Sequence, residues 1–347
     1  MILAPEGKST SISPMKKRIL LPFAILLFAT CTPILPGGPA GPGGRGGGGS
    51  GINPNACGKI STSDVGRKVH AFLTASAELD SASIKLENSV KTACVRMAQE
   101  LQIATTGNTE EVCGRVTQEL EASLQVSVSQ EQRLVTRTEP PVCTTEIGFA
   151  AGIVAECEAS VSADVSIRCD GYCGATCNGV CNGTCSSVNG DGSCAGTCDG
   201  TCEGSCSGSC QGSASVDASA ECKASAEVRA SIHTECTEGK VVVVMENVTV
   251  IDASRLDRAV KAIEVGMPTL LQVGAKAKLV GGAFVHWSKT AVSLAASSGA
   301  FVSDLGASSI CVGLQLAGAV AASADISARI DVSISVSASV SASAGAQ

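Results

Sequence analysis

The sequence has few aromatic residues and few histidines. Its 347 residues include one Trp, one Tyr, six Phe and three His. Proteins that bind single-stranded nucleic acid commonly stack bases on aromatic side chains, and the net charge of −7 also disfavours a polyanionic partner. The histidines, His70, His233 and His286, accompany no nucleophile elbow and no metalloprotease helix motif. We therefore expect no nucleic-acid partner, no cofactor and no enzyme, and interpret the histidines as structural or surface residues.

A stretch rich in glycine and proline covers residues 32–56. Such a stretch cannot bury a core and is typical of a linker. No strand signal precedes it and no Gly-Lys-Ser or Gly-Lys-Thr follows, so a phosphate-binding loop is not indicated. We interpret it as a spacer that separates a folded body from whatever precedes it.

Residues 1–31 have the features of a targeting signal. Met15-Lys16-Lys17-Arg18 is a basic region and residues 19–29 are a short apolar one. Residues 1–14 fit no part of a signal, so Met15 is a candidate start. Residues 27–31 resemble a bacterial lipobox in which Cys31 is lipidated, although Thr30 departs from the small residue usual there. Without Cys31, eighteen of the nineteen cysteines remain, an even number that permits nine disulfides. The alternative is an ordinary secretory peptide.

Fourteen cysteines are arranged as mirror images about the sequence Val188-Asn189-Gly190-Asp191. Asn-Gly is the strongest signal for a two-residue hairpin turn. If residues 189–190 form that turn, opposed residues have numbers that add up to 379. This register predicts the pairs Cys185 with Cys194, Cys181 with Cys198, Cys177 with Cys202, Cys173 with Cys206, Cys169 with Cys210, Cys157 with Cys222, and Cys143 with Cys236. All fall at non-hydrogen-bonded sites, where opposed residues come close enough for a cross-strand disulfide.

We therefore predict a long antiparallel hairpin over residues 143–236, braced by a ladder of disulfides. Its lower part, the two arms outside residues 169–210, has one apolar face, mostly Ala and Val, and one polar face. Its tip, residues 169–210, repeats Cys-x-Gly-x, and outside the central turn at Val188 its only large apolar residues are Tyr172 and Val180. The tip cannot form a hydrophobic core, so its order must come from backbone pairing and disulfides. The four-residue repeat leaves a solenoid open as an alternative to the flat ribbon.

The segment 57–142 begins with helical patterns. Apolar residues recur at three- and four-residue spacing from Ser61, which predicts one long helix, or two helices broken near Asp80, ending before Gly107. Thr109-Glu110-Glu111 opens a second helix, with acidic residues near its positive end. Cys94 and Cys113 lie on these adjoining helices across a short loop, so we expect them to pair.

Three further stretches predict strands. From Ala122 the pattern alternates until Pro140-Pro141, and residues 240–250 are rich in valine. From Ile326 every even residue is apolar and the odd ones are mostly Ser. Because two strands alone cannot bury a face, we expect the last two stretches to widen the base of the hairpin.

Residues 252–322 return to a helical pattern. Pro268 suits the first turn of a helix within this range. Cys57 and Cys311 are the only cysteines left, so by elimination they would pair. The predicted fold class is α+β, with helices packed on an antiparallel sheet from which the disulfide-laddered hairpin projects.

Three alternatives for the function remain beside a structural or adhesive one. Ten cysteines at four-residue spacing could bind metal as thiolates, although zinc sites favour Cys-x-x-Cys and no nearby His supports them. Amphipathic hairpins from several subunits could insert into a membrane. The C-terminal Ser/Ala strand could assemble into fibres.

The motifs Ala155-Glu156-Cys157, the Cys-x-Gly-x block and Ala220-Glu221-Cys222-Lys223 carry a resemblance. With Pro140-Pro141-Val142-Cys143, they resemble a group of cysteine-rich secreted proteins of myxobacteria. The resemblance implies an extracytoplasmic location and no particular activity. Together with the signal and the cysteines, it predicts a non-enzymatic module of the cell surface or periplasm, attached to a membrane through Cys31 and open to protein partners or self-association.

Overall fold

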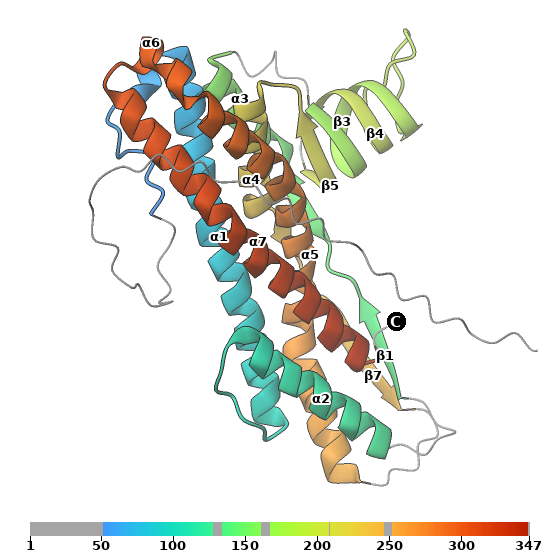
Figure 1. Cartoon of the computed structure of the whole chain (residues 1–347). Coiled ribbons are helices and arrows are strands. Elements are labelled where there is room, and N and C mark those ends of the chain that lie inside the picture. The colour runs from blue at the N-terminus through green and yellow to red at the C-terminus, as the bar shows by residue number, and fades with distance from the viewer. Residues whose placement is uncertain (1–50, 128–133, 161–166, 208, 246–251, 346–347) are drawn as a thin grey trace, which may run out of the picture. The chain divides into compact units, whose positions relative to one another are not determined.

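A computed structural model describes residues 51–127, 134–160, 167–207, 209–245 and 252–345. The chain is mostly helical, with antiparallel strand pairs and several disulfides (Figure 1). The helices are α1 (Asp64–Glu100), α2 (Thr109–Ser127), α3 (Ile147–Glu158), α4 (Ala220–His233), α5 (Ala253–Ser297), α6 (Val302–Leu305) and α7 (Ser308–Ser343), with short 3-10 turns η1 (Ile60–Thr62) and η3 (Ser298–Phe301). The strands are β1 (Leu134–Glu139), β2 (Cys143–Glu146), β3 (Ile167–Cys185), β4 (Thr197–Ser207), β5 (Ser209–Val216), β6 (Glu235–Cys236) and β7 (Lys240–Met245).

The long helices pack mainly against one another. Helix α5 contacts α7, α1 and α4, and α1 also contacts α7, α4 and α2. The single tryptophan, Trp287 of α5, is fully buried, and its ring stacks on Phe72 of α1 with centroids 6.0 Å apart. Its Nε1 donates a hydrogen bond to Ser76 Oγ over 2.8 Å. The one large indole therefore joins α5 to α1 by both packing and a hydrogen bond.

Small and polar residues complete these helix contacts. A Cβ on Gly266 of α5 would lie 2.1 Å from Met97 Cγ of α1, so a larger residue there would force the Met97 side chain to move. Between α7 and α1, Arg329 Nη1 donates to Asp80 Oδ1 over 2.9 Å, and Asp80 is buried. A buried carboxylate needs such a partner, because burial without one is costly.

The predicted strand from Ile326 is wrong, because this segment belongs to helix α7. Its buried positions, Ile326, Ile330, Ser333, Ser337 and Val340, follow the three- and four-residue spacing of a helix. Serine hydroxyls in α7 bond to carbonyls one turn earlier, as Ser337 Oγ does to the Ser333 carbonyl over 2.7 Å. Because alanine and serine are small enough for either structure, the alternation did not decide between them.

The predicted continuous ribbon over residues 143–236 is wrong in its lower part. Residues Ile147–Glu158 and Ala220–His233, the expected strands, are helices α3 and α4. They pack against each other and are joined by the Cys157–Cys222 disulfide. The mirror symmetry of the sequence therefore predicts this cysteine pair correctly, although the pair joins two helices and not two strands. Alanine, the best helix former, is frequent in both segments and favours this outcome.

Three other predictions also change. Helix α2 continues to Ser127, so the strand expected from Ala122 is present only as β1 (Leu134–Glu139). The strand expected over 240–250 is present as β7 over 240–245; the remainder lies outside the described residues. β1 and β7 pair antiparallel as a separate two-stranded sheet and do not widen the base of the hairpin. Pro268 lies inside α5 rather than in a first turn, where packing outweighs the cost of proline.

Candidate functional site

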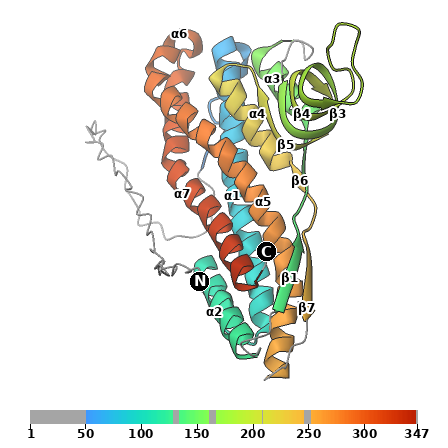
Figure 2. The ribbon, with the colours of Figure 1, turned by 90° about the vertical axis from the view of Figure 1, so that its right-hand side faces the viewer.

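The Cys-x-Gly-x block forms a coil of two antiparallel strands, which Figure 1 shows from the side and Figure 2 nearly end-on. Cys202 of β4 lies opposite Cys181 of β3 and also opposite Cys169 of β3. A single β4 residue therefore has a β3 neighbour on each side, and these two neighbours are twelve residues apart in sequence. In a flat two-stranded ribbon a β4 residue would have only one β3 neighbour. Each turn of the coil thus contains three Cys-x-Gly-x units, and this arrangement is the solenoid alternative rather than the flat ribbon.

Disulfides fill the interior of the coil. Its described bonds are Cys177–Cys202, Cys181–Cys198 and Cys185–Cys194, with Cα atoms 5.9, 5.8 and 5.8 Å apart. These disulfides are the pairs that the mirror symmetry of the sequence predicts. In the backbone pairing, however, each of these cysteines on β3 lies opposite a different cysteine of β4 from the one to which it is bonded. Cys177, Cys198 and Cys202 are at most 1 % exposed. Sulfur therefore takes the place of a hydrophobic core, as the lack of large apolar residues requires.

The outer surface of the coil is polar. Its exposed residues on β3 and β4 include Thr176, Asn178, Asn182, Thr184, Thr197 and Asp199. Val180, 58 % exposed, and Val188 beside the turn, 60 % exposed, are large apolar exceptions in this part of the described chain. These short side chains present hydroxyl, amide and carboxylate groups on a backbone that covalent bonds brace. Such a surface is suited to hydrogen bonding with a polar partner.

The turn that joins the strands is longer than predicted. Asn189 N donates to the Ser193 carbonyl over 2.7 Å, and Gly192 N donates to the Asn189 carbonyl over 3.0 Å. Three residues, 190–192, therefore form the loop, and Gly192 takes the left-handed φ of +85° that its last position needs. The two-residue turn at 189–190 is wrong, and the longer loop shifts the backbone register.

Helix α3 connects the coil to the helical body. Ile147, Ile153 and Val154 pack against the buried cysteines of the coil and Val216 of β5. At the end of α3, Glu158 Oε1 accepts from Ser219 N over 2.8 Å and Glu158 Oε2 lies 2.9 Å from Lys68 Nζ of α1. Burial raises the pKa of Glu158, but hydrogen bonds from Ser219 and Lys68 outweigh it and bring the pKa below its ordinary value.

Four more disulfides lie outside the coil among the described residues. They are Cys57–Cys311, Cys94–Cys113, Cys143–Cys236 and Cys157–Cys222, the partners expected from the sequence. The expected pairs Cys169–Cys210 and Cys173–Cys206 lie outside the residues whose side chains are described, as does Cys31. Disulfides in this number are typical of an oxidising, extracytoplasmic compartment.

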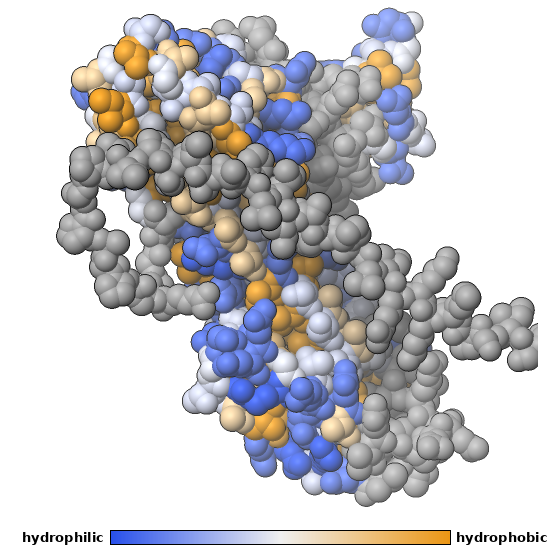
Figure 3. Space-filling model, viewed as in Figure 1, coloured by the Kyte–Doolittle hydropathy of each residue, from blue (hydrophilic) through white to orange (hydrophobic). Residues whose placement is uncertain are grey.

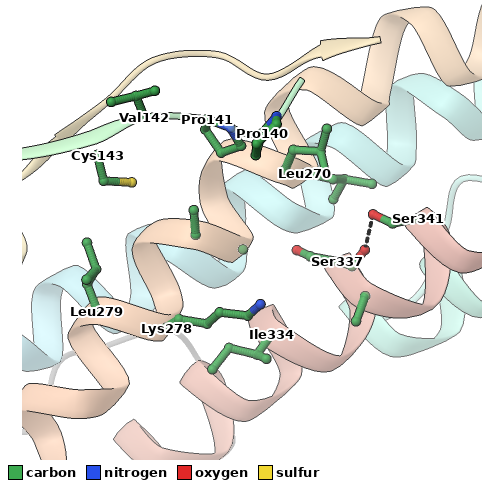
Figure 4. Close-up of a pocket in the computed structure, with 14 residues that line it drawn as sticks. Pro140, Pro141, Val142, Cys143, Leu270, Lys278, Leu279, Ile334, Ser337 and Ser341 are labelled. Carbon is green, nitrogen blue, oxygen red and sulfur yellow. Dashed lines mark hydrogen bonds between the residues drawn. The ribbon is translucent and has the colours of Figure 1, made fainter. Parts of the chain in front are cut away.

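Two pockets border α5 in the described chain, and no sequence pattern predicted either. The first, of about 640 Å³, is a mostly apolar groove between α5, α7 and the Pro140–Cys143 segment (Figure 4). Leu270, Leu279 and Ile334 line it, and Lys278 lies along one side. The second, of about 630 Å³, lies between α1, α5 and the end of α4. In it, burial and the nearby charge of Lys85 lower the pKa of Lys276, against the charge of Glu235.

The three histidines lie apart and each has a local partner. His70 Nε2 is 3.2 Å from Asn55 Oδ1, and His286 Nδ1 is 2.7 Å from Glu227 Oε2. The ring of His233 contacts that of Phe149, with centroids 4.5 Å apart. Within the described ranges, no three His, Cys, Asp or Glu residues are grouped so as to bind a metal ion.

Comparisons with known proteins give no further assignment. No family model, curated protein or solved structure matches this chain. Its function must therefore be inferred from the coil, the body and the surface.

Proposed function

We propose that the protein is a non-enzymatic, disulfide-braced module of the cell envelope, whose coil is the adhesive element. The observation that carries the proposal is the construction of the coil: buried disulfides inside and exposed Thr, Asn and Asp outside. A backbone braced in this way loses little conformational entropy when it binds, so weak polar contacts to a repetitive partner can add up. The expected lipidation of Cys31 would attach the module to a membrane.

The position of the coil favours contact with the envelope near the attachment point. Cys57–Cys311 fixes the first described residues to the start of α7, next to α6. Figures 1 and 2 show α6 and the coil at the same end of the helical body. The first turns of α1 also reach α3, where Arg67 Nε donates to the Cys157 carbonyl over 3.2 Å. The coil is thus proposed to bind a polar polymer of the surface to which the protein is attached.

The alternatives have less support. Membrane insertion required long amphipathic strands, whereas residues 147–158 and 220–233 are helical. Fibre formation required a C-terminal strand in the segment that is helix α7. Thiolate binding of metal requires free cysteines, and the described chain has fourteen cysteines in disulfides.

Retention on isolated envelope tests the proposal. The oxidised protein is incubated with peptidoglycan and with membrane fractions of the producing organism, and bound protein is measured after sedimentation. The variant Asn182→Ala/Thr184→Ala/Asp199→Ala removes polar groups from the outer face of the coil. The matched control, Ser81→Ala/Asn88→Ala/Thr92→Ala, removes three exposed polar groups from α1.

We expect the coil variant to lose at least tenfold in affinity, equivalent to about 1.4 kcal/mol, and the control to bind as wild type. Mild reduction of the disulfides should have the same effect as the coil variant. Equal binding by all three proteins would reject the coil as the adhesive element.

A further inference from the structure

The corner where α5 turns back into α7 is almost free of charge. Between Thr290 and Ala324, Asp304 is the only charged residue. This stretch includes the last turns of α5, η3, α6 and the first turns of α7. Surfaces of soluble proteins usually intersperse charges of both signs, so a long uncharged stretch at an exposed corner calls for an explanation.

The same corner exposes large aliphatic side chains. Val292 and Val302 are each 59 % exposed, Ile310 is 75 % exposed and Leu314 is 67 % exposed. Ile310 and Leu314 are four residues apart and therefore lie on one face of α7. We call these four residues the apolar corner. Figure 3 shows hydrophobic residues exposed among polar ones at the α6 end of the molecule.

The chain enters the body next to this corner. Cys57 is bonded to Cys311, which adjoins Ile310, and Asn53 N donates to Gln315 Oε1, adjacent to Leu314, over 2.8 Å. About twenty residues separate Cys31 from Gly51 in the linker predicted from the sequence, and glycine-rich linkers of that length in general span roughly 25 Å on average. A membrane attachment at Cys31 would therefore keep the apolar corner within reach of the lipid surface.

We infer that the apolar corner docks on a lipid surface. This inference rests on the proposed attachment of the protein to a membrane, and it names a second contact with that membrane. Asp304 is the single charged residue here, although Ser293, Ser297 and Ser303 are exposed beside the patch. The entry of the chain next to the corner therefore favours a lipid surface over a protein partner. Helix α7 is long and apolar enough to cross a membrane, but it packs against α1, α2 and α5. Contact with the membrane surface, not insertion of α7, fits this packing.

Flotation with vesicles tests the inference without the lipid anchor. Residues 32–347 are secreted behind a cleavable signal, which removes Cys31 and the apolar segment 19–29 and keeps the compact unit 47–347. Vesicles are purely zwitterionic or contain anionic lipid. The test variant is Ile310→Ser/Leu314→Ser. The control, Val242→Ser/Val265→Ser, changes residues of β7 and the other end of α5 that are 57 % and 43 % exposed.

We expect the unmodified protein to float with both kinds of vesicle. The Ile310→Ser/Leu314→Ser variant should partition into vesicles at least about tenfold less than the unmodified protein, because burial of each aliphatic side chain contributes strongly. Partitioning of the control should stay within about twofold of the unmodified protein. Circular dichroism and disulfide mapping verify that both variants fold.

Several results would overturn the inference. They are no flotation, equal losses in both variants, or flotation that needs anionic lipid and is insensitive to Ile310→Ser/Leu314→Ser. A dimer in solution that only this variant dissociates would assign the corner to a second copy of the chain instead. None of these results affects the envelope-retention test, which uses variants of the coil.

Discussion

Cys181 is bonded to Cys198, although its backbone lies opposite Cys202. The bond crosses the interior of the coil, while the backbone pairing follows its wall. A flat ladder would have the same disulfides with different backbone neighbours. Disulfide mapping alone therefore cannot distinguish the two architectures, but substitutions that depend on backbone neighbours can.

Gly183 provides such a substitution. A Cβ at this position would lie 1.9 Å from the carbonyl oxygen of Asp199 on the neighbouring strand of the coil wall, whereas a Cβ on Gly190 in the loop would have nothing within 4 Å. We expect Gly183→Ala to lower the free energy of unfolding by about 1–3 kcal/mol, the usual cost of overpacking. Chemical denaturation of oxidised protein measures this loss. Gly190→Ala should have little effect, and equal stability of the two variants would argue against the coil.

The disulfides should differ in their contribution to stability. Cys57–Cys311 joins residues 254 apart in sequence, and Cys185–Cys194 joins residues 9 apart. Closing a longer loop restricts the unfolded chain more. Cys57→Ser/Cys311→Ser should therefore lower the free energy of unfolding by about 2–3 kcal/mol more than Cys185→Ser/Cys194→Ser. Denaturant titration under oxidising conditions compares them. The reverse order would mean that native-state strain, not loop closure, governs these bonds.

Pairing information was readable from the sequence because the cysteines are placed symmetrically about residues 188–191. The symmetry states which cysteines meet, and it holds for the Cys157–Cys222 bond between helices as well as for Cys181–Cys198 in the coil. It does not determine the path of the backbone between the paired cysteines. That path depends on the three-residue loop and on the coiling of the two strands, which a four-residue repeat permits but does not specify.

Helix and strand were hardest to distinguish where residues are small. In α7 the buried set contains Ser333 and Ser337 beside Ile330, so polarity does not identify the inner face. The choice is made by packing against α1 and α5, which lie far away in sequence. Both pockets along α5 and the apolar corner likewise arise from tertiary contacts, although the scarcity of charge between Thr290 and Ala324, where Asp304 is the only charged residue, was visible in the sequence.

The bond between Trp287 and Ser76 makes a prediction about the core. Ser76→Ala leaves the indole Nε1–H without its acceptor in a fully buried position. An unsatisfied buried donor costs about 1–3 kcal/mol, so the free energy of unfolding should fall by that amount, with a shift in Trp287 fluorescence. Ser81→Ala, at an exposed position on the same helix, is the control and should have almost no effect. An unchanged Ser76→Ala variant would show that another acceptor or a water replaces the hydroxyl.

The contacts of Glu158 predict how the stability of the protein changes in acid. Its carboxylate links α3 to Ser219 and to Lys68 of α1, and its pKa lies below the ordinary value of 4.5 in the folded protein. The unfolded chain therefore binds a proton more readily than the folded one, and the stabilisation is present above pH 4.5 and lost as the pH falls through the folded pKa. Glu158→Gln should be less stable than wild type at pH 7 and lose less stability between about pH 5 and pH 3.

The comparison of the two proteins at several pH values also has a matched control. Asp257 and Lys261 form an exposed pair on α5, 2.8 Å apart, with side chains 60 % and 56 % exposed. Surface pairs contribute about 0–1 kcal/mol, so Asp257→Asn should leave the acid profile almost unchanged. If Glu158→Gln keeps the full wild-type slope, the hydrogen bonds to Glu158 do not couple the base of the coil to the body. If its slope decreases while that of Asp257→Asn does not, protonation of this one carboxylate weakens the attachment of α3 to α1 and to the start of α4, and the coil should become sensitive to proteolysis first as the pH falls.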